Sequence, residues 1–162
     1  KALQILGRQD VYCVLVGGDQ GRGSYRAELE AHVHACGLGP AVRLADRCTD
    51  MAAAYMLADV VVSASTRPEG FGRVVVEAQA MGRPVIATDH GGARETVWPE
   101  KSGWLIPPNN PEALAAALEQ ALGLTEVERE VVAQNGRDNV KQNFTMELMC
   151  QRTMDVYRSL LP

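Results

Sequence analysis

The sequence predicts an α/β fold in which a parallel, Rossmann-like sheet carries helices on both faces. Three observations favour this fold. Short apolar runs of strand length alternate with longer segments of helical character, the order typical of a parallel sheet covered on both sides. Several of the apolar runs end in glycine or polar residues, where a strand would leave the sheet. The chain has 162 residues, 46% of them hydrophobic, which suits the core of a single domain over 1–162.

The predicted strands are the apolar runs, taken in order. Residues 11–16 form a continuous apolar run before Gly17 and Gly18, as in a strand that is buried on both faces. The later runs are shorter, and the third strand leads directly into a polar turn. These runs predict strands over 41–45, 60–64, 84–88 and 104–106.

Helices are predicted in the segments between these strands. Gly37 follows the helical segment 24–36 and is expected to close it. Gly82 is expected to end another helix in the left-handed conformation that glycine tolerates. The helices of this part of the chain are predicted over 24–36, 50–58, from Gly72 or Arg73 to 81, and over 92–97.

Capping residues mark the helices of the C-terminal part. Asn110 is a suitable N-cap for a helix with Pro111 at its first position. Thr125 and Glu128 have the spacing of a capping box, which begins a second helix. A third helix is predicted over 146–161. The first of the three carries an apolar stripe formed by Leu114, Leu118 and Leu122.

Composition narrows the possible functions. A formal net charge of −4 without a basic run argues against a nucleic-acid partner. No apolar run approaches the ~20 residues of a membrane span, and no signal peptide is recognisable at the N-terminus. The cysteines show no paired short spacing, so we expect neither a zinc site nor a redox motif, and free thiols suit a cytoplasmic protein. They are Cys13, Cys36, Cys48 and Cys150.

The most informative segment joins the third strand to the next helix and contains Glu69, Gly70, Phe71, Gly72 and Glu77. Free N–H groups and the dipole at a helix start attract phosphate, and glycines let a ligand approach the backbone closely. Glu77 lies about one turn into the helix, on the side of its opening turn. Both carboxylates can accept hydrogen bonds from sugar hydroxyls, so the segment predicts a site for a phosphorylated, hydroxyl-rich ligand. Solvated or salt-bridged glutamates are the alternative. A side chain in place of Gly72 is expected to block the ligand at little cost to the fold.

Other polar turns are predicted at the same edge of the sheet, because ligands of parallel sheets bind beyond the carboxyl ends of the strands. Gly17 and Gly18 open one such turn, although its glycines do not have the spacing of the dinucleotide fingerprint. His90 lies in another turn, and we interpret it as a loop residue with no chemical role. The turns expected at this edge are 17–23, 46–47, 65–72 and 89–92.

Glu69 and Glu77, separated by seven residues that include Gly70-Phe71-Gly72, resemble the signature of the group 1 glycosyltransferases. These are retaining, nucleotide-sugar-dependent enzymes with the two-domain GT-B architecture. The resemblance covers nearly the whole chain, and the order of its motifs is specific for the family but not for a donor or an acceptor. Its further segments are 15–19, 58–62, 78–89, 91–97 and 103–107.

The resemblance implies that the chain is the C-terminal, donor-binding domain of an enzyme whose N-terminal half supplies most acceptor contacts. It implies that Glu77 binds the ribose hydroxyls and that Glu69, the candidate catalytic residue, contacts hydroxyls of the donor sugar. Backbone amides over 71–74 would bind the diphosphate, and residues 44–46 would lie along the base. The implied donor-binding residues are Gly17, Gly18, Leu44, Asp46, Glu69, Gly70, Phe71, Gly72, Arg73, Val74 and Glu77.

The resemblance also implies the chemistry. The donor would be a nucleoside diphosphate sugar, used without a cofactor or a metal. The acceptor would be a glycan or a lipid-linked molecule, as in cell-envelope polysaccharide or lipopolysaccharide synthesis. The parent enzyme would be cytoplasmic or associated with the inner face of the membrane. Two alternatives remain open: a nucleotide-sugar epimerase of the same architecture, against which Glu69 and Glu77 argue, and a non-catalytic nucleotide-binding module.

Two departures from the family are visible. The family domain opens with a strand and a helix that carry an Arg and a Lys for the diphosphate, and residues 1–6 match only the end of that helix. The missing strand belongs in the middle of the sheet, so two strands are expected to have unpaired edges. Rearrangement, pairing with another chain, and a segment outside this sequence are the alternatives. Arg73 stands where the family often has an aliphatic residue, and it either supplements the diphosphate cations or points to solvent.

Overall fold

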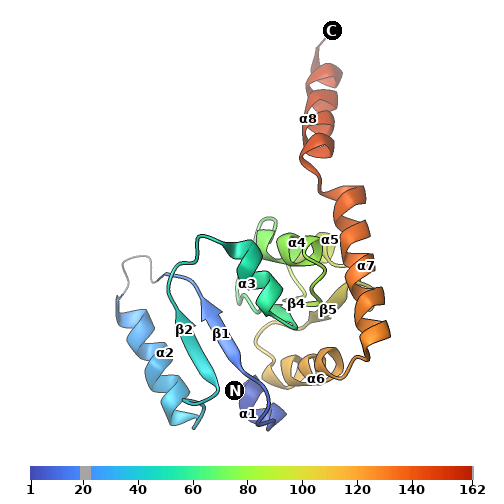
Figure 1. Cartoon of the computed structure of the whole chain (residues 1–162). Helices are drawn as coiled ribbons and strands as arrows, with labels where there is room; N and C mark the ends of the chain where they lie inside the picture. The colour runs from blue at the N-terminus through green and yellow to red at the C-terminus, as the bar shows by residue number, and fades with distance from the viewer. Residues whose placement is uncertain (19–22, 162) are drawn as a thin grey trace.

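A computed structural model describes residues 1–18 and 23–161 of the chain, so part of the predicted 17–23 turn lies outside the described residues. Helices and strands alternate from α1 to α6, and two further helices follow, as the sequence predicts (Figure 1). In order they are α1 (Ala2–Leu6), β1 (Cys13–Val16), α2 (Gly23–Ala35), β2 (Val42–Ala45), α3 (Met51–Leu57), β3 (Val61–Ser63), α4 (Arg73–Ala80), β4 (Val85–Thr88), α5 (Ala93–Thr96), β5 (Gly103–Ile106), α6 (Pro111–Leu122), α7 (Glu126–Asn143) and α8 (Met146–Leu160).

The strands are parallel throughout, but they form two sheets instead of one. The larger sheet has the order β3-β4-β5, and the smaller consists of β1 and β2. Among the described residues, β1 and β3 therefore each have a strand neighbour on one side only. Figure 1 shows β1 and β2 apart from β4 and β5. The structure thus confirms the unpaired edges.

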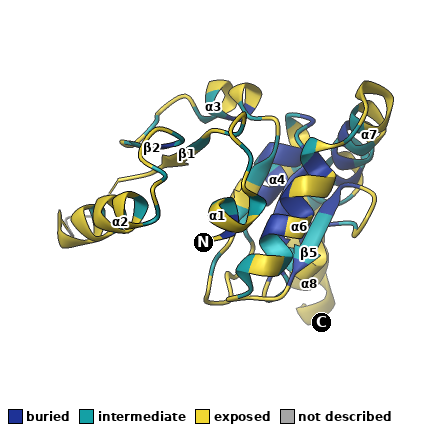
Figure 2. Ribbon diagram, turned by 90° about the horizontal axis from the view of Figure 1, so that it is seen from below, coloured by how far each residue is buried: buried dark blue, intermediate teal, exposed yellow. Residues whose placement is uncertain are grey.

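The core lies on both faces of the larger sheet. β4 is buried along its whole length, and its side chains alternate between two apolar clusters. Val85 and Ala87 pack with Val75 and Ala78 of α4, while Ile86 packs in the cluster that includes α6. Figure 2 shows the buried residues of α4 and α6 gathered around this sheet. Helices thus cover both faces here, as predicted.

The prediction that residues 11–16 form a strand buried on both faces is wrong. The strand begins only at Cys13, and its side chains are largely exposed, with Val14 57% accessible. The reason is that β1 pairs with β2 alone, and α2 beside them has no buried residue. An apolar run indicates the capacity for burial, but a covering partner is needed to bury it.

Most helix ends follow the predicted capping chemistry. The Asn110 side chain accepts a hydrogen bond from the Ala113 N–H at 2.8 Å, and Thr125 and Glu128 form a complete capping box. Gly37 and Gly82 have the left-handed φ values of 69° and 67°. At the other end of the chain, α8 projects away from the body and buries no residue (Figure 1). None of the described helices combines the length and the apolarity needed to cross a membrane.

Candidate functional site

The β3–α4 loop and the start of α4 place the two candidate glutamates near each other. Gly72 is the N-cap of α4, and Arg73 is its first residue. The Glu69 carboxylate lies over this helix start, because its Oε2 is 3.6 Å from the position that a Cβ on Gly72 would occupy. Glu77 lies one turn further along the same helix. The N–H groups at the beginning of a helix lack an i−4 partner. Here the Val75 N–H donates to the Gly72 carbonyl oxygen at 3.0 Å, so the donors offered between the two carboxylates are those before Val75.

Glu77 is held by two side chains in the described structure. Its Oε2 accepts a hydrogen bond from the Tyr55 hydroxyl at 2.8 Å. Its Oε1 accepts hydrogen bonds from Arg73, at 2.8 Å from Nη2 and 3.1 Å from Nε. Arg73 is 83% exposed, so this i,i+4 ion pair contributes little to stability and is easily exchanged. The arrangement leaves Glu77 fixed in place, with its Oε1 facing an exposed partner.

Tyr55 is a site residue that the sequence interpretation missed. It comes from α3, it is only 5% exposed, and it belongs to the apolar cluster under α4. A buried tyrosine needs a hydrogen-bond acceptor, and a tyrosine within an Ala- and Met-rich helix was the signal available in the sequence. Burial first, and then the hydrogen bond to Glu77, raise the pKa of Tyr55 to about 12.

Tyr55 is therefore expected to ionise late. The hydroxyl donates to Glu77 only while it is protonated, so its contribution to stability is complete below the ordinary pKa of 10 and is lost as the pH rises through about 12. The ultraviolet titration of Tyr55→Phe, subtracted from that of the wild type, should show a phenolate transition with a midpoint of about 12. A difference curve centred on pH 10 would mean that Tyr55 does not donate to Glu77.

Glu69 is exposed and is tied to its own loop. Its Oε1 accepts a hydrogen bond from the Ser65 hydroxyl, and its backbone carbonyl accepts one from the Gly92 N–H at 2.9 Å. The next turn, at Gly91 and Gly92, lies against this loop without room for side chains. A Cβ on Gly92 would lie 2.6 Å from the Phe71 carbonyl oxygen and 2.8 Å from that of Gly70. The candidate site thus depends on a close backbone approach between two loops.

The expectation that a side chain at Gly72 costs the fold little is wrong. Gly72 has φ 78°, in the left-handed region, although a Cβ there would make only ordinary van der Waals contacts, with Glu69 at 3.6 Å and Val75 at 3.9 Å. A β-branched residue is strongly disfavoured there, and even alanine would be strained by roughly 1–2 kcal/mol. Substitution of Gly72 is therefore expected to lower stability and ligand binding together, and it cannot separate the two roles.

The remaining residues predicted in this segment are exposed, namely Gly70, Phe71 and Val74. The Phe71 ring is half-exposed and meets Phe144, at the end of α7, edge to face with ring centroids 5.6 Å apart. Val74 is 40% exposed on the first turn of α4. A Cβ on Gly70 would meet no atom within 4 Å, so this glycine borders open space.

The predicted residues at β1 and β2 belong to the smaller sheet. Gly17 and Gly18 follow β1, and Leu44 and Asp46 lie at the end of β2. Arg26 of α2 holds this second turn, with 2.7 Å from its Nη1 to the Asp46 carboxylate and 3.3 Å from its Nη2 to the Leu44 carbonyl. Within the described residues, no hydrogen bond or ion pair joins these four residues to Glu69 or Glu77. Both sets lie at the carboxyl ends of parallel strands, but each on its own sheet.

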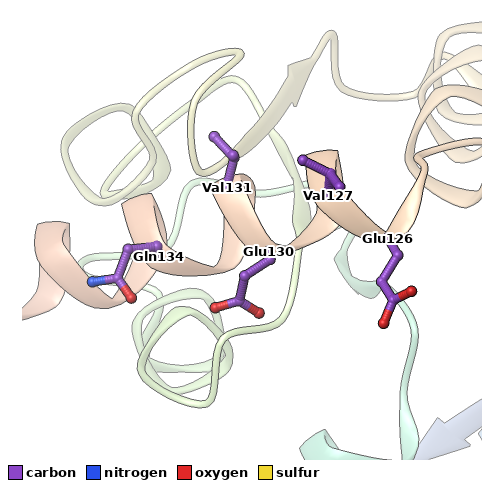
Figure 3. Close-up of a pocket in the computed structure, with 5 residues that line it drawn as sticks. All are labelled: Glu126, Val127, Glu130, Val131 and Gln134. Atoms are coloured by element: carbon purple, nitrogen blue, oxygen red, sulfur yellow. The ribbon is translucent and has the colours of Figure 1, made fainter.

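Two hollows differ in their suitability for a charged ligand. One of about 470 Å³ lies along α7, and Figure 3 shows that its lining side chains all come from this helix. Its ionisable groups are Glu126 and Glu130, so it offers a phosphate no cation. A recess of about 10 Å³ lies at the predicted site, between Ser65, Glu69 and His90. In the described part of the chain, no group of three or more His, Cys, Asp or Glu side chains is placed to hold a metal ion.

Known proteins match this chain along most of its length. The family described as glycosyl transferases group 1 matches residues 1–139. The D-inositol 3-phosphate glycosyltransferase of Jonesia denitrificans is 40% identical over 147 residues, a match that covers 89% of this chain and 34% of that protein. The chain thus spans about a third of the length of this relative.

Solved glycosyltransferase structures share the fold. A glycosyltransferase from Rickettsia africae superposes with a TM-score of 0.91 at 31% identity, over 98% of this chain and 42% of that one. Anabaena HepE, solved in complex with UDP, gives a TM-score of 0.89 at 29% identity, over 98% of this chain and 44% of that one. HepE has also been solved with UDP-glucose. By its family match, its relatives and its fold, the chain belongs to the group 1 glycosyltransferases of GT-B architecture.

Proposed function

We propose that this chain is the donor-binding domain of a larger, retaining glycosyltransferase, which transfers a sugar from a nucleoside diphosphate to an acceptor without a metal ion. The observation that carries the proposal is the helix start at Gly72 and Arg73, set between the carboxylates of Glu69 and Glu77. The dipole and free N–H groups of a helix start favour a diphosphate. Carboxylates on either side can accept hydrogen bonds from a ribose and from a sugar.

Each residue has a separate role in this proposal. Glu77, already oriented by Tyr55, accepts hydrogen bonds from the ribose hydroxyls at its Oε1. Glu69 accepts hydrogen bonds from the donor sugar, and the amides over 71–74 hold the diphosphate. As the bond to the sugar breaks, negative charge grows on the leaving diphosphate, and preorganised donors stabilise it. A ribose bound at Glu77 would take the place of Arg73 there. The exposed Arg73 guanidinium would then add a positive charge near the diphosphate.

The second sheet and the rest of the protein complete the site in this proposal. Leu44 and Asp46 lie along the base, and Gly17 and Gly18 border the donor. The chain spans only about a third of the length of a relative such as the Jonesia enzyme. In this proposal the acceptor contacts come from an N-terminal half of the full-length protein. A strand from outside the present sequence would pair with the free edges of β1 and β3. The acceptor is a glycan or a lipid-linked molecule, and the parent enzyme works in the cytoplasm or at the inner face of the membrane.

The test is a transfer assay on the full-length protein with UDP-, GDP-, ADP- and dTDP-linked glucose, mannose and N-acetylglucosamine. Acceptors should include D-inositol 3-phosphate and undecaprenyl-linked sugars, with products identified by mass spectrometry. We expect one donor class to be used, with or without added EDTA, and the anomeric configuration of the sugar to be retained by NMR. Interconversion of donors without an acceptor would instead establish an epimerase. Failure of every donor to bind in calorimetry would contradict a donor-binding domain.

A further inference from the structure

His90, which we interpret from the sequence as a loop residue with no chemical role, contacts the neighbouring loop. It lies two residues after the end of β4, and its imidazole Nε2 lies 2.9 Å from the backbone carbonyl oxygen of Ser65, at the beginning of the β3–α4 loop. A carbonyl oxygen can only accept a hydrogen bond, so Nε2 carries the proton and donates. The Thr88 hydroxyl donates to the same oxygen, also at 2.9 Å. Two donors from the end of β4 thus hold Ser65 in place.

The same turn also holds the other end of the loop. Two residues after His90, the Gly92 N–H donates to the Glu69 carbonyl oxygen at 2.9 Å. The turn itself is braced by Arg94, whose Nε donates to the Asp89 carboxylate at 2.8 Å and whose Nη2 donates to the Asp89 carbonyl oxygen at 3.0 Å. The stretch from Ser65 to Glu69 is therefore fixed at both ends by one braced turn.

Ser65 passes this constraint on to the Glu69 side chain. Its carbonyl oxygen accepts from His90, while its hydroxyl donates to Oε1 of Glu69. The direction of the Glu69 carboxylate, which is otherwise exposed, then depends on where Ser65 is held. The His90 Nδ1 atom is buried and has no hydrogen-bond partner among the described residues, so Nε2 provides the one polar contact of this ring. That contact is the link between the turn and the carboxylate.

We propose that His90 is a positioning residue that orders the β3–α4 loop through Ser65 and thereby orients the Glu69 carboxylate toward the donor sugar. This inference rests on the proposed function of Glu69. His90 does not touch the donor in this account. Its effect is therefore specific to the sugar: it changes the affinity for a nucleotide sugar and leaves the affinity for the nucleotide unchanged.

The test compares three substitutions of His90 in the full-length protein. Leucine removes the donor at similar volume. Glutamine can place its amide N–H where Nε2 lies, whereas asparagine is one carbon too short to reach the Ser65 carbonyl. With UDP-glucose and UDP as probes in calorimetry, His90→Leu and His90→Asn should bind UDP-glucose about five- to tenfold more weakly, as for a lost hydrogen bond. His90→Gln should bind within about twofold of the wild type, and UDP should bind all four proteins equally.

A double-mutant cycle tests the route through Glu69. In a Glu69→Ala background, His90→Leu should cause no further loss of UDP-glucose affinity, because the carboxylate that it orients is gone. Equal losses for UDP and UDP-glucose, full additivity with Glu69→Ala, or no rescue by glutamine would each overturn the inference and indicate a merely structural role.

Hydrogen exchange separates this inference from the proposed function. Amide exchange over 65–69, the stretch held by the turn, should accelerate in His90→Leu and His90→Asn but not in His90→Gln, with β4 and β5 unchanged. If the wild type bound neither UDP nor UDP-glucose, a site for these ligands would be contradicted, and exchange would still decide whether His90 orders the loop. Unchanged exchange over 65–69 in His90→Leu would overturn the positioning role.

Discussion

Gly92→Ala is expected to lower sugar transfer by the full-length protein by about a hundredfold or more, while the larger sheet stays folded. The added Cβ would lie 2.6 Å from the carbonyl oxygen and 2.7 Å from the Cα of Phe71. These are backbone atoms, so the β3–α4 loop has to move as a unit. Displacement of reacting groups by about 1 Å can cost about a hundredfold in rate. The φ of Gly92 is −62°, so alanine introduces no strain at the residue itself.

The matched control for Gly92→Ala is Gly39→Ala. A Cβ on Gly39 meets no atom within 4 Å, and this glycine is not among those with positive φ. Steady-state kinetics and thermal unfolding of both variants separate the effects. We expect kcat/KM to fall for Gly92→Ala alone, with the far-ultraviolet circular dichroism retained. Activity of Gly92→Ala within threefold of the wild type would show that the loop position does not matter for transfer.

Glu77→Ala is expected to weaken nucleotide binding by about ten- to a hundredfold. A hydrogen bond to a charged acceptor contributes roughly 1.5–3 kcal/mol, and on our proposal the ribose makes such bonds. The substitution also leaves the Tyr55 hydroxyl, held at 2.8 Å from Glu77, without its acceptor. We therefore expect a moderate fall in the melting temperature as well as the loss of affinity for UDP and UDP-sugars.

A second substitution separates binding from stability. In Tyr55→Phe/Glu77→Ala the unsatisfied hydroxyl is removed, so the melting temperature should recover while the nucleotide affinity stays low. Glu28→Ala is the control for loss of a glutamate, since Glu28 is exposed on α2. If nucleotide affinity recovered together with stability, Glu77 would have a structural role and would not bind the ribose.

Local chemistry made much of the fold predictable from the sequence. Asn110, Thr125 and Gly82 act within a few residues of their own position, and the structure places each as its residue type suggests. The strand predicted at 11–16 was different, because its burial depends on what packs against it, and β1 pairs with β2 alone beside a helix that buries no residue. Periodicity reports which face is apolar, and it does not report what covers that face.

The candidate site was predictable only in part, for a similar reason. The β3–α4 segment could be recognised from its own residues, but its supports come from other parts of the chain. Tyr55 lies 22 residues before Glu77, and His90 lies 25 residues after Ser65. Such contacts depend on how α3 and the β4–α5 turn pack beside α4. The left-handed conformation of Gly72 is also a property of the assembled loop.

The most direct measurement of the central claim is a crystal structure of the full-length protein with bound UDP. We expect the ribose hydroxyls within hydrogen-bond distance of the Glu77 carboxylate and the diphosphate over the backbone amides of Gly72, Arg73 and Val74. We also expect Tyr55 to keep its hydrogen bond to Glu77 while Arg73 moves toward the diphosphate. A well-ordered nucleotide bound elsewhere, with Glu77 still paired to Arg73, would contradict the account.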